Sequence, residues 1–222
     1  MINGIFNEIP SVEVLVIDDS SPDGTAQIIE SLQKKFSNLH LLTRVEKSGL
    51  GGAYRVGFAW GIEKGFDEII EMDADGSHQV LDLQSMIAAK EIYPDVMLII
   101  GSRWIKGGRT ENWSFSRKML SRSANLYVRM MLGMGVKDST AGFRLYSSSI
   151  LSKIDLTAIQ SEGYSFQIEM TRAIHKLGGS IVEVPITFME RQEGVSKMSK
   201  KIVKEAMWLV TIWGIKRFLH LK

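Results

Sequence analysis

A short strand-like run at residues 68–72 ends in two aspartates, Asp73 and Asp75, which are followed by Gly76. Side chains alternate along a strand, so both carboxylates point the same way if the extended geometry persists to its end. Two carboxylates on one side favour Mg²⁺ or Mn²⁺, which prefer hard oxygen ligands. In open α/β sheets, ligands bind at this carboxyl edge. The same triplet also occurs as a solvated turn or a helix cap, so alone it leaves the metal site open.

Strand-like and helix-like segments alternate along the first half of the chain. Apolar, β-branched strands are predicted at 12–17, 39–44, 66–72 and 96–100, and amphipathic helices at 26–36, 53–64 and 81–92. This alternation predicts an α/β fold with a mainly parallel central sheet and right-handed crossovers. The glycines at 49–52 favour a substrate-shaping loop over a bare linker.

The second half of the chain is less regular. Helices are predicted at 114–132, 164–177 and 201–221, and a strand at 181–186. We expect residues 1–200 to form one catalytic domain and 201–222 an amphipathic tail helix that is basic and aromatic. From Arg191 onward the sequence holds eight Lys or Arg and two Glu, next to large apolar residues. That pattern is common at membrane surfaces.

Composition excludes some classes of protein. The chain has 222 residues and no cysteine, so disulfides and thiolate metal sites are absent. Its net charge of +2 is too small to argue for a nucleic-acid partner. No apolar stretch reaches the roughly 18–20 residues that a membrane-spanning helix needs. No glycine fingerprint of a nicotinamide-dependent enzyme follows the first strand.

Four motifs now occur in a fixed order: VIDDSSPDGT at 16–25, MDADGSH at 72–78, GSRW at 101–104 and DSTAGFR at 138–144. Together they resemble glycosyltransferase family 2, and within it the polyprenol (dolichol) phosphate mannose synthases, from about Val12 to Lys201. The resemblance implies a Rossmann-like, A-type glycosyltransferase fold. It also implies GDP-mannose as donor, a polyprenyl monophosphate as acceptor and Mg²⁺ or Mn²⁺ as cofactor.

The resemblance also assigns residues to that site. The predicted catalytic residues are Asp75 and Arg103. The predicted metal ligands are Asp73, Asp75 and Ser77, of which the serine hydroxyl is the weakest. The donor is expected to contact Ile17, Asp19, Asp73, Ala74, Asp75, Arg103, Arg191 and Lys197. The acceptor phosphate is expected to contact Arg103, Arg117 and Ser121.

Several simpler interpretations stay open beside these roles. Asp19 also suits an Asx-turn, and the basic segment around Arg191 and Lys197 also suits a solvated loop. A phosphate monoester is mostly dianionic at neutral pH, so the acceptor needs no strong general base. We therefore interpret Glu169 and Asp138 as structural. The donor could also be another sugar nucleotide, such as UDP-glucose, or the chain could be a relative without catalysis.

A lipid acceptor implies that the site meets a bilayer. The helices at 114–132 and 201–221 combine apolar and basic residues, which suits in-plane helices at an interface. We expect a cytoplasmic protein, peripheral on the cytosolic face, with a membrane-protein partner as an open alternative. Packing within the core is the competing interpretation of both helices.

Members of the resembled family begin with a strand that precedes the first helix, and this sequence starts at that helix. A missing strand leaves backbone groups unpaired and a base pocket incomplete. On that reasoning, a chain beginning at Met1 is expected to be less stable, and to bind GDP more weakly, than one extended upstream. Equal melting temperatures and equal affinities would contradict this expectation.

Overall fold

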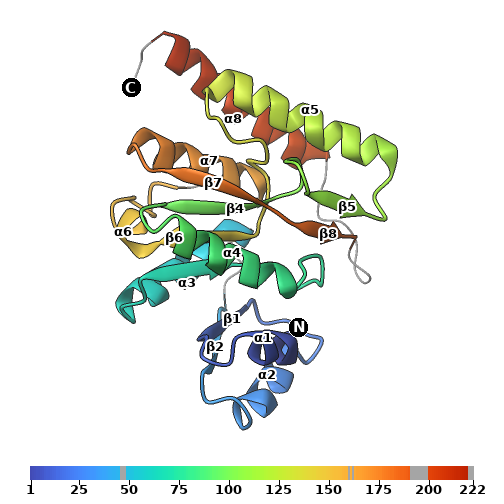
Figure 1. Ribbon diagram of the computed structural model, residues 1–222, viewed down its shortest axis with the longest axis vertical. Helices are drawn as coiled ribbons and strands as arrows, with labels where there is room; N and C mark the ends of the chain where they lie inside the picture. The colour runs from blue at the N-terminus through green and yellow to red at the C-terminus, as the bar shows by residue number, and fades with distance from the viewer. Residues whose placement is uncertain (46–48, 160, 162, 191–199, 220–222) are drawn as a thin grey trace.

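Four strands form the central sheet of the computed structural model (Figure 1), which describes residues 1–45, 49–159, 161, 163–190 and 200–219. Their order is β3 (Glu68–Glu71), β6 (Arg144–Ser147), β4 (Leu98–Ser102) and β7 (Ile181–Pro185). β4 and β7 are parallel, whereas β6 is antiparallel to both β3 and β4. β3, β4 and β7 therefore run the same way, as a mainly parallel sheet requires, and the direction of β6 was not predicted.

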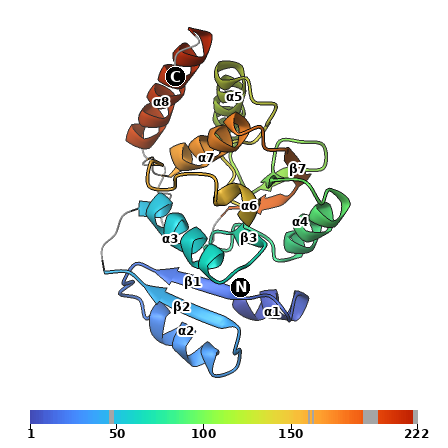
Figure 2. The same cartoon turned by 90° about the vertical axis from the view of Figure 1, so that its left-hand side faces the viewer.

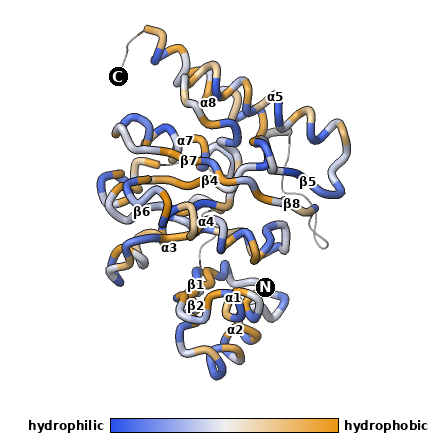
Figure 3. Tube along the Cα trace, in the orientation of Figure 1, coloured by the Kyte–Doolittle hydropathy of each residue, from blue (hydrophilic) through white to orange (hydrophobic). Residues whose placement is uncertain are grey.

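Helices cover both faces of this sheet (Figure 2). Alternate residues of β4 point to opposite faces, as expected for a strand. Leu98 and Ile100 belong to a core that also holds Phe58 and Phe166, from α3 (Gly49–Glu63) and α7 (Tyr164–Lys176). Ile99 faces the other core, with Met86 of α4 (Leu81–Ile92). Because both faces are buried, the central strand β4 is apolar from Leu98 to Ile100 (Figure 3).

The first part of the chain forms a separate two-stranded sheet. β1 (Val14–Asp18) pairs in parallel with β2 (Leu39–Thr43), and α2 (Thr25–Gln33) packs beside them. Within the described residues, β1 pairs only with β2, and β3 pairs only with β6. No backbone ladder among these strands therefore joins the two sheets.

The helix α1 (Ile2–Glu8) bridges the two sheets by side-chain packing instead. Its Ile5 joins the core of α4 and the central sheet. The neighbouring Phe6 packs with Ile29 and Leu39 of the small sheet layer, and stacks on Phe36 at 4.3 Å between ring centroids. Burial of both side chains therefore couples the small sheet to the main body.

Two long helices lie side by side along one end of the molecule (Figure 1). α5 (Phe115–Leu132) and α8 (Lys200–Phe218) pack together with α7, and Val210 of α8 is buried in that contact. The predicted tail helix is thus present and packs on the main body; the domain boundary at residue 200 stays a prediction. No helix in the described part of the chain has the length and apolarity to cross a bilayer.

The remaining elements are short. β5 (Arg109–Glu111) pairs in parallel with β8 (Thr187–Met189), and α6 (Ser148–Leu151) directly follows β6. None of these three was predicted, because segments of three or four residues carry almost no periodicity. The first two place Trp113 and Phe188 next to the candidate site, where their rings meet.

The glycine segment at 49–52 is not the predicted loop, because it forms the first turn of α3. A Cβ atom on Gly51 would lie 2.7 Å from the carbonyl oxygen of Ser161 and 2.9 Å from Phe166. This glycine is therefore explained by the close approach of α3 to the α7 region, and not by a need for turn conformations.

Candidate active site

The two aspartates lie in a tight turn just beyond β3. Gly76 has a φ of +77°, which glycine adopts without strain. The backbone N–H of Ser77 donates to Oδ1 of Asp75 at 3.0 Å. The triplet therefore does form a turn, which was the simpler interpretation of it. The same turn holds the Asp75 carboxylate in place.

Asp73 is anchored from a helix on the far side of the strand. The Tyr54 hydroxyl of α3 donates to Oδ1 of Asp73 at 2.8 Å, and Nε2 of His78 lies 3.8 Å from Oδ2. Burial is the main cause that raises the pKa of Tyr54 well above its ordinary value, followed by the charge of Asp73. Tyr54 therefore stays a protonated donor that fixes the carboxylate.

Two polar side chains beside the turn are buried without satisfied partners. Ser77 is 1% exposed and His78 is 3% exposed. The Ser77 hydroxyl and both His78 ring nitrogens have no hydrogen-bond partner among the described residues. Because an unmade buried hydrogen bond is costly, these atoms indicate a place where a ligand completes the site.

The residues of this turn fit a Mg²⁺ or Mn²⁺ ion. No cluster of three His, Asp or Glu side chains with metal-binding geometry occurs among the described residues. Asp73, Asp75 and the Ser77 hydroxyl nevertheless offer hard oxygen donors. Mg²⁺ is commonly held by one or two carboxylates, with substrate phosphates and water as the other ligands. The predicted metal role of these three residues remains a prediction that their chemistry supports.

Arg103 follows β4 and is held by a buried carboxylate. Its Nε and Nη2 donate to the two oxygens of Asp138 at 2.7 and 2.6 Å, and its backbone N–H donates at 2.9 Å. Burial by itself lowers the pKa of Arg103, but the charge and hydrogen bonds of Asp138 raise it overall, and Asp73 adds to this. The Arg103 guanidinium is therefore a fixed positive charge, and the negative charge of Asp73 acts on it.

Asp138 is in turn oriented by neighbouring elements. Its backbone N–H, and that of Lys137, donate to the Glu183 carboxylate of β7 at 2.9 and 2.8 Å. Asp138 is fully buried, as the interpretation of it as structural requires. Among the described residues, Nη1 of Arg103 donates no hydrogen bond to protein. The contact of Arg103 with phosphate stays a prediction.

The other predicted donor contacts lie in different places. Asp19 follows β1 and accepts from Nε and Nη2 of Arg44, each at 2.6 Å. Ile17 is half-buried on β1, and Ala74 is exposed in the aspartate turn. Arg191 and Lys197 lie outside the described residues. These donor roles stay predictions.

The predicted acceptor residues belong to α5. Arg117 Nη1 donates to Glu190 at 2.6 Å, and its guanidinium lies 3.9 Å above the Trp113 ring. Ser121 lies one turn further along α5, and its carbonyl accepts from Asn125 at 3.0 Å. Both acceptor roles stay predictions.

Below the aspartate turn, β3 carries a buried acid that was not predicted. Glu71 Oε1 lies 3.8 Å from Nε of Arg144 and accepts from the Tyr146 hydroxyl at 3.4 Å. Burial raises the pKa of Glu71 to about 8, although the charge of Arg144 opposes the rise. The side chain is therefore mostly a neutral acid at pH 7.

We expect a Glu71→Gln variant to gain stability relative to wild type as the pH rises. The pKa of Glu71 is about 8 in the folded protein and near its ordinary 4.5 when unfolded. Between these values the folded state holds a proton that the unfolded state releases, so wild-type stability falls as pH rises. Urea unfolding across this window measures the difference. A Glu68→Gln control, on the exposed start of β3, should keep the wild-type profile; identical profiles for all three proteins would refute the shift.

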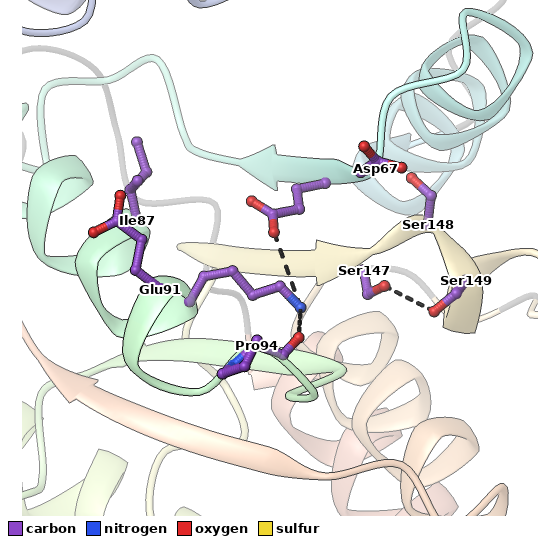
Figure 4. Close-up of a pocket in the computed structure, with 9 residues that line it drawn as sticks. Asp67, Ile87, Glu91, Pro94, Ser147, Ser148 and Ser149 are labelled. Atoms are coloured by element: carbon purple, nitrogen blue, oxygen red, sulfur yellow. Dashed lines mark hydrogen bonds and ion pairs between the residues drawn. The ribbon is translucent and has the colours of Figure 1, made fainter.

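The hollow at the opposite end of β3 is a less suitable site. It has a volume of about 440 Å³ and is lined by residues such as Asp67, Glu91 and Ser149 (Figure 4). Several of its polar groups are already paired: the hydroxyls of Ser147 and Ser149 bond each other at 2.8 Å, and Lys90 donates to the Pro94 carbonyl at 2.6 Å. This hollow lies at the amino end of β3, whereas Asp73 and Asp75 follow its carboxyl end.

Comparison with known proteins decides the family. The family model described as glycosyl transferase family 2 matches residues 1–155. The chain belongs to this family. Within it, the chain is 50% identical over 207 residues to an undecaprenyl-phosphate mannosyltransferase of Micrococcus luteus, covering 93% of this chain and 84% of that protein. It is 46% identical over 218 residues to a polyprenol monophosphomannose synthase of Mycolicibacterium smegmatis, covering 97% and 81%.

Solved structures share the fold of this chain. Glucosyl-3-phosphoglycerate synthase from Mycobacterium tuberculosis, in complex with Mn²⁺, UDP-glucose and phosphoglyceric acid, superposes with a TM-score of 0.65 at 15% identity. The match covers 100% of this chain and 75% of that one. The predicted A-type glycosyltransferase fold is thereby confirmed, and this family member is a glycosyltransferase.

Proposed function

We propose that this glycosyltransferase moves mannose from GDP-mannose to a polyprenyl monophosphate. Two relatives named for mannose and a polyprenyl phosphate carrier, at 50% and 46% identity, support the sugar and the acceptor. The observation that carries the chemistry is the Asp73–Asp75 turn together with the fixed positive charge of Arg103, on which the charge of Asp73 acts. Carboxylates that hold a divalent cation and an arginine that offers a fork both suit a diphosphate.

The reaction is a single displacement at the anomeric carbon of mannose. An oxygen of the acceptor phosphate attacks that carbon, the bond to the diphosphate of GDP breaks, and the sugar configuration inverts. When bound, Mg²⁺ or Mn²⁺ would neutralise the diphosphate as it leaves. Asp73 and Asp75 would hold that ion, and Arg103 would orient phosphate oxygens without moving, because Asp138 fixes it.

An acceptor comparison tests the proposal. Radiolabelled mannose from GDP-mannose is offered, in detergent with Mg²⁺, to a polyprenyl phosphate and to the matching neutral polyprenol. Label in the lipid phase only with the phosphate would support direct attack by the phosphate, because a hydroxyl would need a general base. Transfer to the polyprenol at a comparable rate would overturn this mechanism.

The outer faces of α5 and α8 suit a membrane surface. Phe115, Met119, Leu126 and Met130 are exposed on α5, and their spacing places them on one face of the helix. Trp208 and Ile215 on α8, with Leu219 directly after it, form a similar exposed row. Lys118, Arg122 and Arg129 border the first row at helical spacing. Apolar rows beside basic residues are what an in-plane interfacial helix presents.

We expect the double variant Met119→Gln/Trp208→Gln to bind anionic lipid vesicles at least about tenfold more weakly, because each exposed side chain loses apolar burial in the interface. Vesicle co-sedimentation at low and high salt measures binding, and salt should weaken the basic contribution. The matched control Ile28→Gln/Ile92→Gln removes exposed apolar residues from α2 and α4. Equal losses in both variants would show that these two helices do not form the docking face.

A further inference from the structure

Three arginines and two tryptophans interleave beyond the end of β4. This arginine–tryptophan cluster consists of Arg103, Trp104, Trp113, Arg117 and Arg122. The guanidinium of Arg103 lies 5.6 Å from the Trp104 ring and 5.4 Å from the Trp113 ring. Arg117 lies 3.9 Å from Trp113, and Arg122 lies 4.9 Å from Trp104. The two indoles meet edge to face at 6.3 Å, so all five side chains form one continuous stack.

The cluster has more positive than negative charge. Arg103 is paired with Asp138, which is fully buried, and Arg117 is paired with Glu190, whose side chain is 43% exposed. Arg122 is exposed and has no ion-pair partner within the described residues. Two carboxylates therefore face three guanidinium groups. The Arg117–Glu190 ion pair is exposed to solvent, so an incoming anion can take the place of the Glu190 carboxylate at little cost in free energy.

Both indole N–H groups are buried without an acceptor. Trp113 is 8% exposed. The Nε1 atoms of Trp113 and Trp104 have no hydrogen-bond partner in the described part of the chain. An indole N–H can only donate, so these two groups remain unsatisfied until something supplies an acceptor oxygen.

The position of Trp113 adds to this preference for an anion. Trp113 directly precedes Ser114, the N-cap of the 18-residue helix α5, whose first turn contains no acidic residue. The amino end of a helix carries partial positive charge. Trp113 also reaches the aspartate turn through ring contacts: it meets Phe188 at 5.4 Å, and Phe188 meets His78 at 5.1 Å. An anion at the cluster is therefore next to the reacting end of the site.

We propose that the indole N–H groups of Trp113 and Trp104 donate hydrogen bonds to the phosphate monoester of the acceptor, beside Arg117. This inference rests on the proposed function for the identity of the phosphate. It adds two neutral donors to the arginines. Arg122, at the outer end of the stack and bordering the exposed row on α5, is the first charge that a lipid phosphate meets.

Indole NMR signals test the contact directly. The chain has five tryptophans, so ¹⁵N-labelled indoles give a small set of N–H signals, assigned from Trp→Phe variants. Titration with a short-chain prenyl phosphate should shift the Trp113 and Trp104 signals downfield and leave that of Trp213 unchanged. Neutral prenol should shift neither, and inorganic phosphate should do so only at much higher concentration. Unmoved Trp113 and Trp104 signals at saturating prenyl phosphate would overturn the inference.

Kinetics of Trp113→Phe supply the second readout. Phenylalanine keeps a ring for Arg117 and Phe188 but lacks the donor, so KM for the prenyl phosphate should rise about tenfold, the effect of one hydrogen bond to a charged group. The kcat and the KM for the sugar donor should stay within about twofold. The control Trp213→Phe changes an indole that also lies on an arginine, Arg172, at 5.1 Å, and should leave all constants unchanged.

The two readouts separate failure of this inference from failure of the proposed function. If the wild type transfers no mannose yet both indoles respond to the prenyl phosphate, the phosphate site stands and the donor assignment fails. If mannose transfer is robust but KM is unchanged in Trp113→Phe, and the indole signals do not move, the tryptophans do not bind the acceptor.

Discussion

An Asp75→Asn variant is expected to lose sugar transfer by about 10³-fold or more, because a charged oxygen that stabilises a leaving diphosphate is replaced by a neutral amide. Asparagine keeps an Oδ1 atom that can still accept from the Ser77 N–H, the 3.0 Å bond that closes the turn. The fold and the turn should therefore survive. Initial transfer rates and Mn²⁺ binding by calorimetry measure the two effects together.

The matched control for this variant is Asp155→Asn. Asp155 is exposed and accepts from the backbone N–H of Thr157 at 3.0 Å, so it is a turn aspartate of the same kind away from the candidate site. The control should retain wild-type transfer and Mn²⁺ binding. An Asp75→Asn variant that keeps more than half of the wild-type rate would exclude Asp75 from the metal site.

Removal of the Asp138 carboxylate is expected to have the largest effect on folding. In Asp138→Ala the buried guanidinium of Arg103 loses two hydrogen bonds and its counter-charge, and the Arg103 backbone N–H loses a third bond. Leaving a buried charge unpaired costs about 3–5 kcal/mol in the free energy of unfolding. For a chain of this size that corresponds to a fall of about 10 °C in Tm. Urea and thermal unfolding measure the loss.

Two further variants show whether the cost comes from the unpaired charge. Glu111→Ala breaks the exposed pair with Arg109, whose atoms are 3.1 Å apart, and should cost at most about 0.5 kcal/mol. The double variant Arg103→Met/Asp138→Leu removes both charges and should recover most of the stability while transfer stays lost. A double variant as unstable as Asp138→Ala would show that the unpaired charge does not carry the cost.

The strands and helices could be predicted where one periodic pattern spans a whole element. The helix over 81–92 is predicted and observed with the same bounds, because its apolar residues repeat at helical spacing between polar turns. The antiparallel direction of β6 could not be predicted, because a four-residue strand takes its direction from the neighbours it inserts between. Gly51 misled the loop prediction, since its reason is a tertiary contact with the α7 region.

The site was predictable only as a set of charged end-of-strand residues. Asp73, Asp75 and Arg103 each follow a predicted strand, and the shared direction of β3 and β4 is consistent with a common edge for them. Their partners were not predictable, since Tyr54 lies 19 residues from Asp73 and Asp138 lies 35 residues from Arg103. The buried indole donors were also missed. A tryptophan between a short strand and an N-cap serine is the sequence signal that was present.

The most direct test of the proposed function is a comparison of donors with the unmodified chain. GDP-mannose and UDP-glucose, each radiolabelled in the sugar, are offered to a polyprenyl phosphate with Mg²⁺, with and without chelator. We predict that label enters the lipid phase from GDP-mannose at least about 100-fold faster than from UDP-glucose, a discrimination that differential transition-state binding can supply, and that chelator stops it. Faster transfer from UDP-glucose, or no transfer from either donor, would contradict the account.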